Sequence, residues 1–197
     1  MRRATSVIAW LACVGARPSR GDWQPAAADA DNPLGCIVTG LEHGGTTVTS
    51  ELIMTAPGYL GPFEAGFLKA ARPEEFPKVK PFAAWTRADL GLNGSKWTAL
   101  VGQRTHLDMY RYALRESPLL LKANTTRFVD KVPGYRENLE AVMRRAPGVP
   151  VVFVYKTRAS AYKSYVTHRH MDEGAFNRTW AAFMRRLDDA RRVPESK

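Results

Sequence analysis

The stretch of sequence that decides the fold reads Gly35-Cys36-Ile37-Val38-Thr39-Gly40-Leu41-Glu42-His43-Gly44-Gly45-Thr46-Thr47. Its apolar run at 36–38 predicts a buried strand, and a glycine-rich turn follows that strand. Thr46 and Thr47 then open a run to Met54 that favours a helix. A strand, a glycine turn and a helix start together form an anion cradle, because backbone N–H groups and the positive end of the helix dipole converge there. The stretch therefore predicts a site for a phosphate-like group.

The spacing of this loop can be compared with the nucleotide-binding pattern GxxxxGK[ST]. Gly40, Gly45 and Thr47 fit the pattern, but Thr46 stands in the lysine position. The loop therefore lacks the side chain that reaches a triphosphate. A glycine-rich turn that binds no ligand stays open as an alternative at this point.

The rest of the chain alternates between strand and helix patterns. Further strands are expected at 59–61, 127–130 and 149–155, and the last of these is an apolar, β-branched run typical of a central parallel strand. Helical spacing is expected at 63–71, 106–115, 135–145, 159–168 and 176–192. The segment 72–95 is rich in Pro and Trp without a clear period, which favours a lid-like insertion on the substrate side. The pattern predicts an α/β protein, a P-loop-like three-layer fold with a central parallel β-sheet flanked by helices.

Composition narrows the possible partners. The chain has 197 residues, enough for one domain with a sizeable core, and a formal net charge of +10. A basic balance favours acidic partners. The arginine pairs at 144–145, 185–186 and 191–192 are scattered, with little interleaving of basic and aromatic residues, so nucleic acid is disfavoured as a partner. With only Cys13 and Cys36, an internal disulfide framework is excluded if the N-terminal segment is cleaved.

The N-terminus resembles a targeting segment. Residues 1–20 combine a positive start, a short apolar run and small residues, which predicts a secretory signal peptide or a short signal anchor. A mitochondrial-type or disordered leader stays open. Residues 21–34 are expected to be a linker and residues 35–197 an α/β domain. Sequons at Asn93, Asn124 and Asn177 agree with a glycoprotein of the secretory pathway, in the Golgi lumen or secreted.

Chemistry-bearing residues follow several predicted strands. The glycine turn follows the first strand, Glu64 the second, Lys131 the third, and Lys156 with Arg158 the fourth. The carboxyl ends of parallel strands meet at one edge of a sheet, where ligands bind. An anion cradle, cationic side chains and one carboxylate at such an edge predict transfer of an anionic group, with the carboxylate as the base.

These residues also carry a family resemblance. The loop 40–47 resembles the 5′-phosphosulfate loop of sulfotransferases that use 3′-phosphoadenylyl sulfate (PAPS). The runs 130–135 and 146–155 resemble the middle of the Golgi and bacterial, carbohydrate-type branch of that family. The stretch 61–68 resembles the segment that carries the catalytic glutamate, and Lys156 with Ser164 matches the Arg…Ser pair that holds the 3′-phosphate.

The resemblance implies a reaction and roles for individual residues. It implies sulfuryl transfer from PAPS to a hydroxyl or amine acceptor, in particular a carbohydrate. No metal is expected, because His106, His168 and His170 show no metal-ligand spacing with acids or cysteines. Glu64 and Lys131 would be the catalytic residues. The residues that would bind the cofactor are His43, Gly44, Gly45, Thr46, Thr47, Lys156 and Ser164.

This sequence departs from the family pattern at several positions. His43 stands where the family has a fixed positive charge, Lys156 replaces an arginine, and Arg158, which stands at a common proline position, is a candidate to compensate. The C-terminal part that usually completes the purine and 3′-phosphate site is not recognisable, so we expect either a domain truncated at its C-terminus or a degenerate enzyme. A catalytically degenerate remnant that binds an anion or a nucleotide is therefore the alternative, and a P-loop kinase is a further one. Glu64 as a carboxylate at a helix start and Lys131 as a surface lysine also stay open.

Overall fold

The computed structural model describes residues 12–14 and 31–192, which form a five-stranded sheet in the order β1-β5-β2-β4-β3. The strands are β1 (Ala12–Val14), β2 (Leu34–Gly40), β3 (Tyr59–Leu60), β4 (Arg127–Lys131) and β5 (Val151–Val154). β3, β4, β2 and β5 are parallel to their neighbours, whereas β1 pairs with β5 in the antiparallel direction. The predicted α/β class with a central parallel sheet is confirmed, and the antiparallel strand β1 was not expected.

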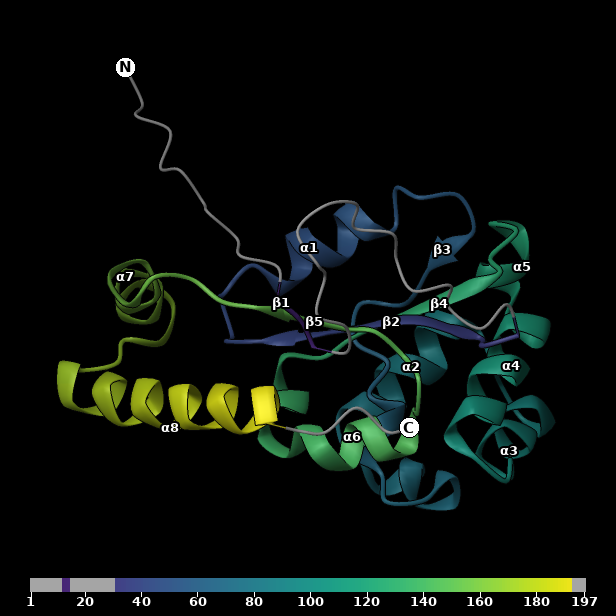
Figure 1. The fold of residues 1–197 in the computed structure, drawn as a ribbon. Helices are drawn as coiled ribbons and strands as arrows, with labels where there is room; N and C mark the ends of the chain where they lie inside the picture. Colours follow the sequence, from purple (N-terminus) through teal and green to yellow (C-terminus); the bar gives the residue numbers. More distant parts are fainter. Residues whose placement is uncertain (1–11, 15–30, 193–197) are drawn as a thin grey trace.

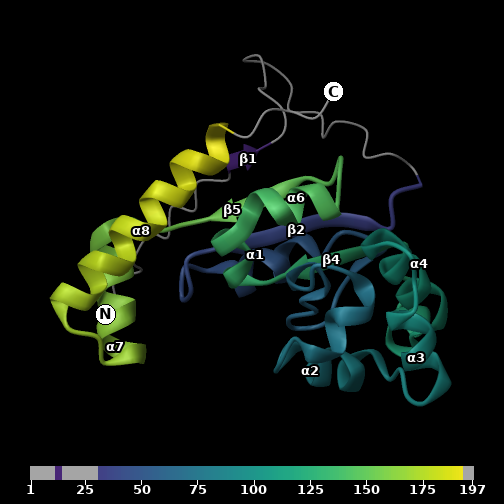
Figure 2. The ribbon, with the colours of Figure 1, turned by 90° about the horizontal axis from the view of Figure 1, so that it is seen from below.

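Helices cover both faces of this sheet. Alternate β2 residues point to opposite faces: Cys36 and Val38 pack toward α1 (Thr46–Ile53), whereas Ile37 belongs to the larger cluster on the other face. That second face is covered by α6 (Leu139–Arg145) and α8 (Glu173–Arg192), as Figures 1 and 2 show. The predicted three-layer arrangement is confirmed, and burial on both faces explains why the strands read as continuous apolar runs.

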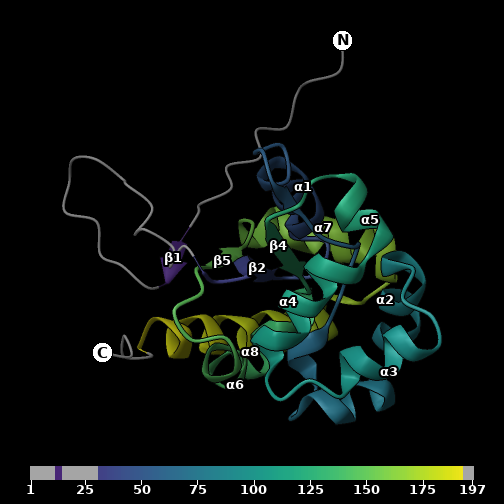
Figure 3. The same cartoon turned by 90° about the vertical axis from the view of Figure 1, so that its right-hand side faces the viewer.

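The remaining helices lie at the two ends of the sheet. Figure 3 is viewed from the end where the helices of the middle of the chain gather. These helices are α2 (Phe82–Leu90), α3 (Ser95–Val101), α4 (His106–Glu116) and α5 (Pro118–Lys122), and α7 (Arg158–Arg169) lies at the opposite end. Among the helices described, none is long and apolar enough to cross a membrane.

The helix expected at 63–71 is wrong. The chain there is irregular up to Gly66 and forms only one 3-10 turn, η1 (Phe67–Lys69). Gly66 has a φ of 74°, a left-handed conformation that a helix does not continue through. Phe67 and Leu68 are buried as expected, but Phe63 is 61% exposed. The segment is therefore an extended arm that enters the core only at its second half.

The prediction that 72–95 is a lid-like or substrate-side insertion and not scaffold is also wrong, although Phe82 of this segment does line the cavity described below. The segment contains η2 (Pro73–Lys78) and the whole of α2, and Phe76 and Leu90 from these elements are fully buried. The prolines at 73, 77 and 81 disrupt the helical period without preventing helix formation, because Pro73 opens η2 and Pro81 caps α2. The segment is therefore part of the scaffold.

Two boundary predictions are refined by the structure. The helix expected at 135–145 consists of η3 (Pro133–Asn138) followed by α6, with Leu139 and Val142 facing inward. The predicted leader at 1–20 lies outside the described residues except for β1. Residues 21–30 of the predicted linker also lie outside the described residues. The last residue of that linker, Leu34, is the first residue of β2. The leader and linker stay predictions.

Candidate active site

The glycine loop joins β2 to α1 and is held close to β5. A Cβ on Gly40 would lie 2.0 Å from the carbonyl oxygen of Val154, so only glycine allows the two strands to approach as they do. Gly45 caps α1 with a φ of 107°, again a glycine conformation. The Gly44 amide donates to the carbonyl of Leu41 at 2.8 Å. This hydrogen bond closes the loop. The Gly44 N–H, which was expected to bind an anion, is therefore used within the loop.

The start of α1 is left open for an anion. Its first turn contains no acidic residue, and no side chain caps it. The first amides of a helix have no intrahelical acceptor, and Gly45, Thr46 and Thr47 all line a cavity. The positive end of the helix dipole therefore faces the cavity without a compensating carboxylate of its own helix.

Arg136 fixes the end of β2 beneath this loop. Its backbone N–H donates to the Thr39 hydroxyl at 3.0 Å, and its guanidinium donates to the carbonyls of Gly40 (3.1 Å) and Pro133 (2.9 Å). The Thr39 hydroxyl in turn donates to the Pro133 carbonyl at 3.0 Å. These bonds tie the loop to the segment after β4. Arg136 was not predicted from the sequence, where its only signal is its place five residues after Lys131.

Glu64 and Lys131 form a buried ion pair. Lys131 Nζ donates to Glu64 Oε1 at 2.9 Å, and the two side chains are 3% and 16% exposed. The Phe63 ring lies over the same ammonium, 3.6 Å from Nζ to the ring centroid. The alternative interpretations of these two residues are therefore wrong: Lys131 is not a surface lysine, and Glu64 does not lie at the start of a helix. Glu64 lines the cavity, whereas Lys131 does not.

A buried carboxylate holds the arm that carries Glu64. Asp130 accepts hydrogen bonds from the hydroxyls of Tyr110 and Tyr135, the latter at 2.6 Å, and from the Gly66 amide at 3.4 Å. The Tyr135 hydroxyl also accepts from the Leu68 amide at 3.2 Å. Burial raises the pKa of Asp130 to about 6, against the opposing effect of the two tyrosine hydrogen bonds. This cluster was missed, because its members are distant in sequence.

Lys156 and Ser164 meet at the other side of the cavity. Lys156 follows β5, Ser164 lies on α7, and Lys156 Nζ donates to the Ser164 hydroxyl at 3.2 Å. Both residues line the cavity, so the predicted pair is brought together. Arg158, expected as a possible compensation, contacts Asn177 and the Phe176 ring on α8 instead. It does not line the cavity and is not available to assist Lys156 in this conformation.

His43 adds a neutral imidazole to the cavity. It has a φ of 55°, and its ring stacks on His168 with the centroids 5.0 Å apart. Its pKa is lowered, first by burial and then by the neighbouring His168 and Arg169, with Lys156 a smaller cause and Glu42 opposing. Arg169 and Glu42 form an ion pair beside it. The fixed positive charge that the resemblance leads one to expect at this position is therefore absent from His43 itself near neutral pH.

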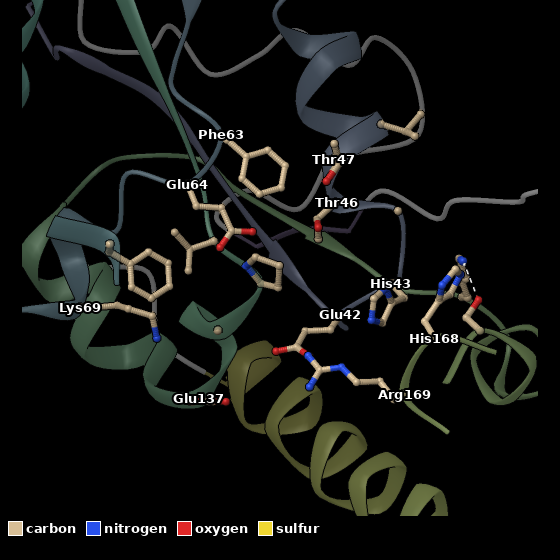
Figure 4. Close-up of a pocket in the computed structure, with 18 residues that line it drawn as sticks. Glu42, His43, Thr46, Thr47, Phe63, Glu64, Lys69, Glu137, His168 and Arg169 are labelled. Carbon is tan, nitrogen blue, oxygen red and sulfur yellow. Dashed lines mark hydrogen bonds and ion pairs between the residues drawn. The ribbon is translucent and has the colours of Figure 1, made fainter. Parts of the chain in front are cut away.

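His43, the loop residues from Gly45 to Thr47, Glu64 and the Lys156–Ser164 pair surround one cavity of about 640 Å³, drawn in Figure 4. Its lining consists of Glu42, His43, Gly45, Thr46, Thr47, Val48, Phe63, Glu64, Lys69, Phe82, Val132, Pro133, Gly134, Glu137, Lys156, Ser164, His168 and Arg169. Every predicted site residue except Gly44 and Lys131 is in this set. The sequence analysis missed the contributions of Phe63, Lys69, Glu137, His168 and Arg169. No group of three or more potential metal ligands occurs within residues 31–192 or in β1.

Comparison with known proteins adds one distant likeness. No protein-family model matches the chain, and a search of curated proteins finds no match. Among solved structures, the chain is similar to the crystal structure of sulfotransferase STF1 from Mycobacterium tuberculosis H37Rv, with 18% identity and a TM-score of 0.44. The match covers 83% of this chain, which spans 60% of the length of the mycobacterial chain. A likeness of this extent does not bear on the reaction, which has to be argued from the site.

Proposed function

We propose that this protein is a sulfotransferase that moves a sulfuryl group from PAPS to a hydroxyl or amine acceptor. One observation carries the proposal. The glycine loop, the Lys156–Ser164 pair and Glu64 come from distant parts of the chain and line the same cavity. An anion cradle, a second cationic anchor and a carboxylate base around one space are the parts that transfer of an anionic group requires.

The donor fits the groups that the cavity offers. The amides of Gly45, Thr46 and Thr47 at the open end of α1 would hold the 5′-phosphosulfate. Lys156 and Ser164 would hold the 3′-phosphate, in line with the family resemblance. Thr46 in place of the P-loop lysine disfavours a triphosphate. The volume of about 640 Å³ lies in the range of ligand pockets.

Transfer requires a base and stabilisation of the leaving group. The acceptor oxygen or nitrogen attacks sulfur, and the bond from sulfur to the bridging phosphate oxygen breaks. The electron pair stays on that phosphate, which leaves as adenosine 3′,5′-bisphosphate. Glu64 takes the proton of the acceptor, and the loop amides stabilise the charge on the leaving oxygen. Lys131 orients the Glu64 carboxylate through their ion pair.

Glu64→Gln tests the proposal. Radiolabelled sulfate transfer from PAPS to a panel of glycans should fall by ~10²–10⁴-fold, because the base is lost. Calorimetric binding of adenosine 3′,5′-bisphosphate should persist, because Glu64 is not among the donor anchors. Glu140→Gln, at an exposed position on α6, is the matched control and should transfer normally. Absence of bisphosphate binding to the folded wild-type protein would refute the proposal.

His43 is the observation that favours the second candidate, a catalytically degenerate protein that binds an anion or a nucleotide. An imidazole that is neutral near pH 7 leaves the donor site one charge short of the family pattern. This candidate predicts bisphosphate binding without any sulfate transfer, and no effect of Glu64→Gln. A glycan acceptor and a place in the secretory pathway are also proposals; they derive from the resemblance, the predicted leader and the sequons.

A further inference from the structure

The charges around the cavity divide into paired and unpaired groups. Glu64 is paired with Lys131 at 2.9 Å, and Glu42 is paired with Arg169. Glu137 has Arg136 as its cationic neighbour at 3.8 Å. The three carboxylates of the lining are thus each matched by a cation. Any further cation that lines the cavity is therefore available to compensate a charge that the ligand brings.

Two lining lysines remain, and they lie in different parts of the cavity. Within the described chain, neither Lys69 nor Lys156 has a carboxylate within ion-pair distance. Lys156 meets Ser164 and belongs to the proposed donor site. Figure 4 shows Lys69 on the side of Glu64 and Phe63, away from His43 and His168. Lys69 is therefore not part of the proposed donor site.

Lys69 is held in place without being neutralised. Its ammonium lies 5.2 Å from the centroid of the Phe82 ring. It also occupies the space above Gly134, where a Cβ would lie only 2.9 Å from Nζ. An aromatic face stabilises a cation and leaves its charge available to an anion. The half-buried position removes part of the solvent that would otherwise screen this charge.

Resting on the proposed sulfotransferase function, we propose that Lys69 forms an acceptor subsite for an anionic group, so that the acceptor is a ring compound bearing both a hydroxyl and a carboxylate. Its hydroxyl lies at Glu64 and its carboxylate at Lys69. The Phe63 ring, 61% exposed beside Glu64, offers an apolar surface for the ring of the acceptor. A uronic acid in a glycan and a phenolic acid share this chemistry.

Matched pairs of acceptors test the subsite. Calorimetry, with and without adenosine 3′,5′-bisphosphate, would compare an oligosaccharide ending in glucuronic acid with its glucose counterpart. A second arm would compare 4-hydroxyphenylacetate with its methyl ester. In one arm at least, the acid should bind about tenfold more tightly than its neutral partner, as expected for a charge-assisted contact. The arm that shows the difference identifies the source of the ring.

Variants of Lys69 decide whether this preference belongs to the subsite. Lys69→Met keeps the length of the side chain without its charge and should abolish the difference, whereas Lys69→Arg should retain most of it. Lys78→Met, at an exposed position of η2 outside the cavity, is the matched control and should behave like the wild type. Equal binding of acid and neutral partner in both arms, or a preference that survives Lys69→Met, would overturn the inference. Loss of bisphosphate binding would count against the donor proposal alone, because acceptor binding is also measured without nucleotide.

Discussion

His43 determines how much positive charge the loop presents to an anion. Its imidazole lies among His168, Arg169 and Lys156, which together with burial lower its pKa, while Glu42 acts in the opposite direction. Protonation of His43 is therefore disfavoured near neutral pH by its surroundings in the protein. A bound phosphate-like group would favour the protonated form, so anion binding and proton uptake by His43 should be linked.

Replacing His43 with lysine should strengthen binding of adenosine 3′,5′-bisphosphate at pH 8 about fivefold, the effect of one partly exposed charge. The advantage should shrink as the pH falls toward 5.5, because the fraction of wild-type imidazole that is protonated rises as the pH falls. Calorimetry across this range measures the ratio of the two dissociation constants. The titration of the ligand's own phosphates cancels in that ratio.

His43→Asn provides the control. It stays neutral at every pH, and asparagine tolerates the left-handed conformation of residue 43. The wild type should therefore outperform His43→Asn increasingly as the pH falls. A ratio of wild-type to lysine affinity that is the same at pH 8 and pH 5.5 would contradict the assignment.

Some residues of the site could be predicted because they follow a recognisable local sequence pattern. Thr46 and Thr47 follow a glycine pattern, and Lys156 follows the most apolar strand. Asp130 and Lys69 were not predictable in this way. Asp130 acts through Tyr110 and Gly66, and Lys69 through Phe82, partners that no local period connects. Their roles depend on the tertiary fold.

At the scale of elements, the approach of β2 to β5 sets the position of the loop. Gly40 makes this approach possible, because a Cβ there would collide with the carbonyl of Val154. The collision partner is backbone and cannot move away as a flexible side chain would. The end of β2, the carbonyls held by Arg136 and the start of the loop would all have to shift together.

Gly40→Ala should lower the free energy of unfolding by about 1–3 kcal/mol, the range for mutations that overpack a core site. Urea unfolding followed by circular dichroism measures the change. Gly174→Ala is the control, since its Cβ would meet only the side-chain ends of Asp172 and Arg178 at the start of α8. That variant should be neutral or slightly stabilising. A Gly40→Ala protein as stable as the control would refute the close-approach argument.

The elements predicted well from the sequence are those with a simple pattern of burial, either buried throughout or buried along one face. β5 and α4 were predicted nearly at their observed bounds, because a fully buried strand and a one-faced helix carry clear periods. The segment 63–71 was predicted as a helix because Phe67 and Leu68 continue a helical spacing from Phe63. Gly66 in a left-handed conformation breaks that helix, and Phe63 turns toward the cavity instead of the core.

At the scale of the whole molecule, two buried groups give stability opposite pH dependences. Burial lowers the pKa of His106 to about 4, so its contribution is present above about pH 6.5 and is lost as the pH falls toward 4. Burial raises the pKa of Asp130 to about 6. Its contribution is fully present below about pH 4 and is lost as the pH rises through 6. Between about pH 4 and pH 6 the two contributions oppose each other.

His106→Gln should reveal this opposition. Glutamine retains a donor for the Ala70 carbonyl, which His106 Nε2 contacts at 3.2 Å, but it does not titrate. As the pH is lowered from 6.5 to 4, the wild type loses the contribution of His106 and the variant does not. The free energy of unfolding of the variant minus that of the wild type should therefore increase by about 1 kcal/mol for each pH unit of decrease. Urea titrations at several pH values measure this difference. It should be flat above pH 7, and a flat difference below pH 6 would contradict the buried, neutral state of His106.

Strand β1 ties the predicted leader to the part of the molecule that carries the proposed donor site. Cys13 lies opposite Val152 in the antiparallel pairing with β5, the strand that leads directly into Lys156. The predicted signal peptide includes residues 12–14. If it is cleaved off, these residues cannot form the edge strand of the sheet. If processing removes them, the β5 backbone is left as an unpaired edge of the kind that accepts a strand from another chain. Maturation would then exchange an intramolecular strand for a site of β-augmentation, next to the segment that carries the proposed donor anchor.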